Sequence, residues 1–302
     1  MANDPLHGWG AEALWSQLEP LLPGLSVEIV RNMVSTNTAL LQRARGASHQ
    51  RDSDAIEAAQ VRHSVEGAAF GRRAIDVQPC LLVAEHQSGG RGRQGRSWQS
   101  NPGASLTFSL CVPLASVDLS GLSLALGVAL CDALDPVRAS KPQRIGIKWP
   151  NDLWLLDATG AGRKLGGMLI ETVAVGRQRL VVIGVGLNVR AFDAAQVSTG
   201  FAAVQEIEPD ASAPALLARV ALPLVQALQR FEAAGFEAFA EHYAARDLLR
   251  GRAVRTTQPG VSEGIAQGVS AQGALLLLTP EGPVSITSGE VSVRLQPDAT
   301  AP

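Results

Sequence analysis

The sequence of 302 residues predicts an α+β protein that ends in a small β-barrel. Two observations support this. Stretches with strand alternation mix with stretches of helical periodicity over roughly the first 250 residues. The last fifty residues contain only short strand candidates punctuated by glycine and proline. A chain of this length buries about three quarters of the surface that its unfolded form exposes, so its core needs no disulfide or metal.

The helices are predicted from apolar residues that recur every three or four positions. Strands are predicted where apolar residues alternate or form a short buried run, and residues 105–111 place Leu106, Phe108 and Leu110 on one face. The predicted helices are residues 9–22, 120–134 and 213–249. The predicted strands are residues 26–30, 79–84, 105–111, 145–149, 166–175 and 179–189, the last two as neighbours.

Residues 42–76 have a different composition from the rest of the chain. They contain six arginines, five acidic residues and two histidines, with Phe70 as the one aromatic residue. Such a segment cannot nucleate a core, so we predict a flexible surface insertion with some helical character. We place the domain boundary after Leu249, which gives a catalytic domain of residues 1–249 and a terminal domain of residues 250–302.

The formal net charge of -2 argues against bulk attraction to nucleic acid or to an anionic membrane. The sequence shows no signal peptide and no membrane span. Its cysteines, Cys80, Cys111 and Cys131, lie far apart and are predicted to be buried reduced thiols of a cytoplasmic protein. The five histidines lack the spacing of metal ligands, so no structural metal is expected.

The segment GGRGRQGRSW, from Gly89 to Trp98, concentrates three arginines among four glycines between two strands. Glycines let backbone amides approach a ligand closely, and guanidinium groups match phosphate or carboxylate oxygens. Taken alone, the segment is equally consistent with an anion-binding loop, a solvated basic loop or an RNA-binding segment. It lacks the pattern of a Walker loop or a dinucleotide fingerprint.

Four other motifs are individually ambiguous. KWPND, Lys148 to Asp152, is either a ligand-facing strand end or an ordinary turn. Lys164 in RKLGG faces either a ligand or solvent. The alternating glycines of GVGLN, from Gly184 to Asn188, indicate close approach of a ligand or tight packing against a helix. The residues after Val34 either cap a helix or grip a polar heterocycle.

Together and in this order, the five motifs resemble the catalytic core of the biotin protein ligase family, the biotin-[acetyl-CoA-carboxylase] ligases. The resemblance runs from about Val34 to Leu295, and the terminal segment resembles the SH3-like barrel of that family. It implies a mixed β-sheet of the biotin/lipoate ligase type, packed with helices. It also implies that biotin and ATP form biotinyl-5'-AMP and pyrophosphate, after which biotin passes to one lysine of a biotin carboxyl carrier protein.

The resemblance also implies roles for individual residues. The catalytic residues would be Lys164, Arg91, Arg93 and Asp152. The biotin-binding residues would be Ser35, Thr36, Asn37, Gln87, Gly90, Arg91, Gly92, Arg93, Lys164, Gly167 and Gly184. The ATP-binding residues would be Arg93, Arg96, Trp98, Lys148, Asn151, Asp152, Lys164 and Asn188, with Asp152 also a candidate Mg²⁺ ligand.

Two departures from the family pattern are the long segment 42–76 and the loop DATGAG before Arg163. Only 34 residues precede Ser35, too few for the winged-helix domain of the repressor branch, so no DNA binding is expected. The alternatives are a lipoate or octanoate protein ligase and a non-catalytic sensor of biotinyl-adenylate. The sequence leaves the choice between monomer and homodimer open.

Overall fold

The computed structural model describes most of the chain, and its residues form two compact units. The first unit comprises residues 1–117 and 163–226, and the second comprises residues 118–162 and 227–302. The described residues are 8–46, 58–61, 78–115, 118–137, 142–158, 160–175, 178–192, 200–287 and 293–295. Among them, no helix combines the length and the apolar character that a membrane crossing requires.

The first unit is built on a mixed sheet whose strands follow the order β2-β1-β3-β6-β10-β9. Only the β1–β3 pair is parallel, and the other pairs are antiparallel. This confirms the predicted mixed sheet and the pairing of the two long strands. The strands are β1 (Ser26–Met33), β2 (Ala58–Val61), β3 (Cys80–Gln87), β6 (Ser105–Pro113), β9 (Gly162–Val175) and β10 (Gln178–Asn188).

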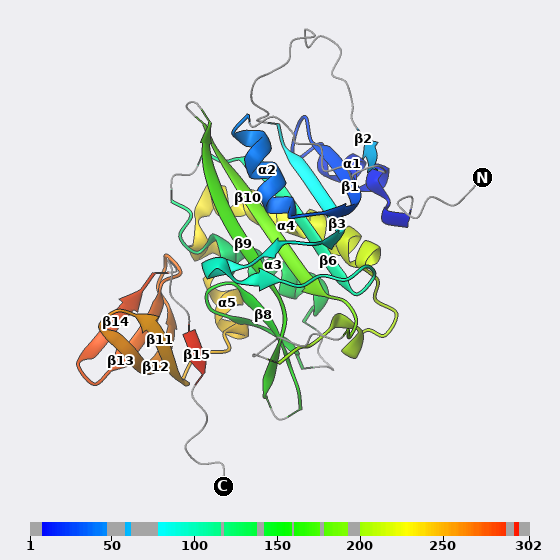
Figure 1. Cartoon of the computed structure of the whole chain (residues 1–302). Coiled ribbons are helices and arrows are strands. Elements are labelled where there is room, and N and C mark those ends of the chain that lie inside the picture. Colours follow the sequence, from blue (N-terminus) through cyan, green and yellow to red (C-terminus); the bar gives the residue numbers. More distant parts are fainter. Residues whose placement is uncertain are drawn as a thin grey trace. The chain divides into compact units, whose positions relative to one another are not determined.

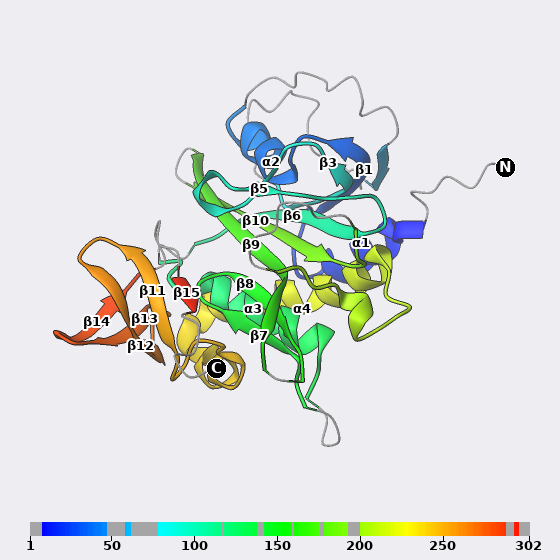
Figure 2. The same cartoon turned by 60° about the horizontal axis from the view of Figure 1, so that its bottom comes forward.

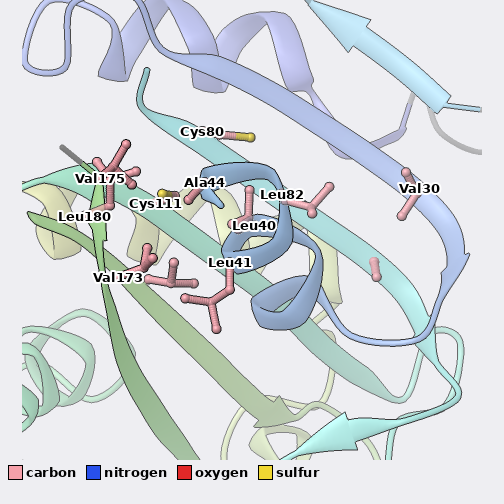
Figure 3. Close-up of a cluster of buried hydrophobic side chains, with 12 residues drawn as sticks. Val30, Leu40, Leu41, Ala44, Cys80, Leu82, Cys111, Val173, Val175 and Leu180 are labelled. Carbon is pink, nitrogen blue, oxygen red and sulfur yellow. The ribbon is translucent and has the colours of Figure 1, made fainter. Parts of the chain in front are cut away.

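Helix α2 (Thr36–Ala44) lies on one face of this sheet and packs against β3, β6 and β10 (Figure 1). Its second half covers a hydrophobic cluster of side chains from five strands (Figure 3). Burial removes these apolar groups from water and stabilises the fold. The cluster consists of Val30, Leu40, Leu41, Ala44, Cys80, Leu82, Ala84, Cys111, Val173, Val175, Leu180 and Val182. Helix α1 (Ala11–Leu18) contacts β1 and β2.

The second unit contains α3 (Leu122–Leu134), which packs against the hairpin of β7 (Ile145–Lys148) and β8 (Asp152–Leu156) (Figure 2). The guanidinium group of Arg246, in α5 (Ala240–Arg246), is buried and donates to the carbonyl of Ile145 and to the carboxylate of Asp132. Because a buried charge needs partners, these bonds hold α5, α3 and the start of β7 in fixed relation.

The second unit also contains the predicted barrel, a five-stranded antiparallel sheet in the order β14-β13-β12-β11-β15 (Figure 1). The indole nitrogen of Trp149, which follows β7, donates to the carbonyl of Gly273 at 3.0 Å. This bond ties the β12–β13 turn to the KWPND segment. The strands are β11 (Ala253–Gln258), β12 (Val261–Val269), β13 (Leu275–Thr279), β14 (Gly282–Ile286) and β15 (Val293–Leu295).

Two expectations need correction. The predicted continuous helix 213–249 is instead α4 (Ala213–Ala234), a 3-10 turn (Phe236–Phe239) and α5. Gly235 separates them with a φ of 65°, a backbone conformation that ends a helix and that glycine adopts at little cost. The hydrophobic periodicity continues across this break, so periodicity alone could not locate it.

The second correction concerns residues 42–76. Residues 42–44 continue α2, where Ala44 is buried in the core, and residues 58–61 form β2 rather than helix. Strand β2 pairs antiparallel with β1, satisfies backbone groups on the side of β1 away from β3, and forms the edge of the sheet. Such pairing depends on backbone groups and leaves little trace in the hydrophobic pattern. Residues 47–57 and 62–77 lie outside the described residues, and the flexible insertion remains a prediction for them.

All three cysteines are free and buried, as predicted. Cys80 and Cys111 occupy paired positions on β3 and β6, and Cys131 lies in α3. Burial raises the pKa of the Cys80 and Cys131 thiols to about 12, because an apolar surrounding disfavours the thiolate.

Candidate active site

The first part of the candidate site is the N-terminus of α2. Ser35 is the N-cap residue, and its hydroxyl accepts a hydrogen bond from the backbone nitrogen of Thr38 at 3.4 Å. The capping interpretation of this motif is therefore confirmed for Ser35. Ser35, Thr36 and Asn37 are each at most 4% exposed, so the helix begins inside the protein rather than at its surface.

Gln87, at the end of β3, meets the first turn of α2. Its Oε1 accepts from the backbone nitrogen of Thr36 at 2.8 Å and from the Thr36 hydroxyl at 3.3 Å. That hydroxyl also lies 2.6 Å from the hydroxyl of Ser109 on β6. Ser100 fixes the backbone of Gln87 by accepting from its nitrogen at 2.7 Å. The sequence motifs around residues 35–37 and 87 therefore meet in one buried polar network.

Asn37 continues the network toward β9. Its Oδ1 accepts from the Ser109 hydroxyl at 2.6 Å, and its Nδ2 donates to the carbonyl of Leu169 and to Oε2 of Glu171 at 3.1 and 3.0 Å. Both N–H groups of this amide are thus used within the protein. The amide also lies over Gly184 of β10, where an added Cβ would overlap it. Close packing against a helix, one of the two interpretations left open for Gly184, therefore occurs.

The arginine-glycine segment folds into a two-stranded hairpin of β4 (Gly90–Arg91) and β5 (Ser97–Trp98). Gly92 donates to the carbonyl of Arg96 at 2.7 Å and closes the loop that contains Arg93. The Arg91 guanidinium is half exposed. It lies 3.3 Å from Oε1 of Glu171 and 3.5 Å from the Thr38 hydroxyl, which brings the hairpin to the start of α2.

Trp98, at the end of β5, lies against Gly186 of β10. A Cβ added to Gly186 would come 2.5 Å from Cε2 and 2.9 Å from Nε1 of the indole, so only glycine fits there. The indole nitrogen is buried and has no hydrogen-bond partner among the residues that the structure describes. An unpaired buried donor costs free energy. A molecule bound beside the indole could accept its hydrogen bond and remove that cost.

Lys164 lies near the start of β9. Its backbone nitrogen donates to the carbonyl of Gly200, and its carbonyl accepts from the nitrogen of Ala202. Asn188, at the end of β10, donates from Nδ2 to the carbonyls of Lys164 and Ala202 at 3.2 and 3.0 Å. Asn188 is 4% exposed, and in this structure its amide ties the backbone of Lys164 to that of Ala202. Gly167 lies on the same strand, paired with Gly186.

The remaining predicted residues belong to the second unit. Lys148 and Asp152 are paired positions of the β7–β8 hairpin, and Asn151 lies in the turn between them. Lys148 is 8% exposed, and its ammonium lies 4.8 Å from the centre of the Trp154 ring, a favourable cation–π distance. KWPND therefore forms the turn of a β-hairpin, flanked by Lys148 and Asp152.

Sequence reasoning missed Ser100, Ser109 and Glu171. Ser109 belongs to the alternation of β6, whose polar positions would ordinarily face solvent. Here both faces of the strand are buried, and Ser109 is 0% exposed. Glu171 interrupts an apolar strand, and that single acidic residue was the one available signal.

Comparison with known proteins now adds to this geometry. Residues 76–188 match the Biotin/lipoate A/B protein ligase family, and residues 250–294 match the Biotin protein ligase C terminal domain. The biotin--[acetyl-CoA-carboxylase] ligase of Mycobacterium tuberculosis is 34% identical over 232 residues, which cover 72% of this chain and 79% of that protein. The chain belongs to the biotin protein ligase family.

Two other family members extend the comparison. The bifunctional ligase/repressor BirA of Salmonella typhimurium is 35% identical over 70% of this chain and 66% of its own length. The solved structure of the biotin protein ligase from Aquifex aeolicus in complex with biotin and ATP is 25% identical. It covers 89% of this chain and 99% of its own chain, with a TM-score of 0.65. The fold of this biotin protein ligase family member is therefore that of its relatives.

Proposed function

We propose that this protein activates biotin with ATP and transfers it to one lysine of a biotin carboxyl carrier protein. The observation that carries the proposal is the meeting of the α2 N-terminus, the arginine-glycine hairpin and the glycines of β10 on one sheet. Membership of the biotin protein ligase family, and a structural relative solved with biotin and ATP, support it.

In the first step, a carboxylate oxygen of biotin bonds to the α-phosphorus of ATP, and pyrophosphate leaves. Two anions approach each other, so cations that lower their repulsion accelerate the step. We assign this work to Lys164, Arg91 and Arg93. In the second step, the amine of the carrier lysine bonds to the acyl carbon and AMP leaves. Asp152 is our candidate for assisting the loss of the amine proton.

The urea end of biotin requires donors and acceptors on a surface that excludes water. The Ser35 hydroxyl accepts from Thr38 and keeps its proton to donate, whereas the Thr36 hydroxyl donates its one proton within the network and can still accept. Gln87 lies beside them. Asn37 already donates both amide protons within the protein, so we propose that it fixes the floor of the site. Four glycines would leave space for the ligand because they carry no side chains: Gly90, Gly92, Gly167 and Gly184.

For ATP, we propose that Trp98 stacks on the adenine ring and that Arg96 and Lys148 meet the phosphates. Asn188 would act by holding the backbone of Lys164, because its amide donates to that carbonyl. The arginine-glycine hairpin would also shield the adenylate, since an acyl-adenylate hydrolyses readily in water.

Magnesium would accompany ATP. Mg²⁺ usually binds one or two carboxylates together with substrate phosphates, and it prefers oxygen ligands. Asp152 and the amide oxygen of Asn151 fit that preference. Bound there, the ion would neutralise phosphate charge.

The test is the intact mass of a purified biotin carboxyl carrier domain after incubation with the protein, Mg²⁺-ATP and equal amounts of biotin and lipoate. We expect one biotinyl increment. A lipoyl increment would assign the protein to lipoate ligation. Biotin binding without any increment on several carriers would indicate a non-catalytic sensor.

The matched variants are Lys164→Ala and Arg219→Ala. Lys164→Ala should lose at least 100-fold in adenylation rate, since one positioned group that stabilises transition-state charge is worth about 10²–10³. Arg219 pairs with Glu208 and serves as the control for removal of a cation. Equal activity of both variants would contradict the role of Lys164. We propose that the reaction takes place in the cytoplasm.

A further inference from the structure

Glu171 occupies an unusual position on β9. It lies on the face of the sheet beneath α2, opposite Val182 of β10. On the same face of β9, Val173 and Val175 belong to the hydrophobic cluster. Glu171 therefore places a carboxylate at the border between this cluster and the polar network, with its side chain 22% exposed.

The two carboxylate oxygens of Glu171 have different partners. Oε2 accepts from Nδ2 of Asn37 at 3.0 Å, and Oε1 lies 3.3 Å from Nη2 of Arg91. Nη1 of Arg91 donates to the Thr38 hydroxyl at 3.5 Å. Asn37 and Thr38 belong to the first turn of α2, whereas Arg91 belongs to the arginine-glycine hairpin. One carboxylate thus connects both elements.

We infer that Glu171 is a positioning residue that holds the Arg91 guanidinium in place for the biotin carboxylate. The inference rests on the proposed function. Arginine has many rotamers, and a half-exposed side chain without a partner would sample most of them. The guanidinium carries five N–H donors in a fixed fork, so contacts to Glu171 and Thr38 leave capacity for an anionic ligand. Glu171 acts through Arg91 and touches no substrate.

Glutamine at this position separates the two contacts. Glu171→Gln keeps the size of the side chain and one oxygen that accepts from Asn37, but it removes the charge that attracts Arg91. Glu171→Ala removes both contacts, so Nδ2 of Asn37 loses this acceptor. The control is Glu208→Gln, which removes the carboxylate of the Arg219 ion pair in the same unit.

The experiment is calorimetric titration of each variant with biotin, together with KM values for biotin and ATP in the carrier assay. We expect Glu171→Gln to weaken biotin about fivefold, the upper range for a solvent-accessible ion pair. Its KM for ATP and its melting temperature should stay near those of the parent. In an Arg91→Ala background, Glu171→Gln should cause no further loss of biotin affinity.

Three outcomes would overturn the inference while the parent protein remains active. One is unchanged biotin affinity in Glu171→Gln. Another is an equal loss in Glu208→Gln. The third is a full additional loss in the Arg91→Ala background, which would show that Glu171 does not act through Arg91. Absence of biotin binding and ligation in the parent protein would instead contradict the proposed function.

Discussion

The sheet face beneath α2 has two halves of opposite character, although the same strands form both. Under the second half of the helix, β9 and β10 present Val173, Val175 and Leu180, which belong to the hydrophobic cluster (Figure 3). Under the helix N-terminus, the same strands present Gly184 and Glu171, and Gly186 lies beneath Trp98. The hydrophobic half of the sheet face stabilises α2, and the polar half leaves room for polar side chains and for a ligand.

The contrast shows how one helix can be fixed in the fold by hydrophobic burial and still contribute polar residues to a binding site. The hydrophobic half gains free energy from burial, at roughly 25 cal/mol per Å² of apolar surface. The polar half contributes little net stability, because its hydrogen bonds replace bonds to water. The polar half can therefore hold Thr36, Asn37 and Gln87 in a fixed arrangement only because the hydrophobic half holds the helix.

The largest expected effect is on the hydrophobic half. Leu82→Ala should lower the free energy of unfolding by about 3 kcal/mol, because Leu82 is fully buried and truncation leaves a cavity. Biotin affinity of the folded protein should be unchanged. Urea unfolding and calorimetry measure the two quantities. The control is Leu278→Ala, at a leucine 50% exposed. Loss of biotin affinity in Leu82→Ala would show that the two halves are not separable.

The next largest effect on stability and biotin affinity is expected at Gly184. In Gly184→Ala, the added Cβ would overlap the Asn37 amide. We expect a loss of about 2 kcal/mol in stability, within the range for overpacking, and biotin binding at least tenfold weaker. The control is Gly8→Ala, where nothing lies within 4 Å of the new Cβ. Normal biotin affinity in Gly184→Ala would contradict the arrangement of Asn37 over β10.

A smaller effect is expected inside the polar network. Ser109→Ala removes the hydroxyl between Thr36 and Asn37, at a cost of about 1 kcal/mol in stability and a severalfold loss of biotin affinity. The control is Ser105→Ala, at another buried serine on the same face of β6, whose hydroxyl accepts from the backbone nitrogen of Asn101. Equal biotin affinity in both variants would mean that the network is dispensable.

The smallest effect concerns the buried thiols. Burial raises the pKa of Cys80 and Cys131 to about 12 from 9.0. A raised acid pKa means that the folded state holds the proton more tightly, so this contribution to stability is complete below pH 9 and is lost as the pH rises toward 12. At pH 8, iodoacetamide should label neither thiol in the native protein and both after denaturation, as read by mass spectrometry. Iodoacetamide labelling of Cys80 in the native protein would contradict the burial of the hydrophobic half.

Much of the fold followed from local patterns. Alternation predicted β6, β9 and β10, and the glycine and proline spacing predicted the terminal barrel. The break at Gly235 and the strand β2 were missed, because both depend on backbone geometry rather than on side-chain hydrophobicity. Of the candidate site, the motif residues were identified, whereas Ser109 and Glu171 were not, since neither belongs to a recognisable motif.

The sequence by itself determined most of the elements, the five motifs and their resemblance to biotin protein ligases, because periodicity and residue order are properties of the chain. Only the tertiary structure decided which residue each motif contacts. Ser35 caps α2, Asn37 covers Gly184, and Trp98 covers Gly186. Glu171 contacts both Arg91 and Asn37, and Asn37 lies 134 residues earlier in the chain. Such contacts arise from the register and packing of distant strands, which no local pattern encodes.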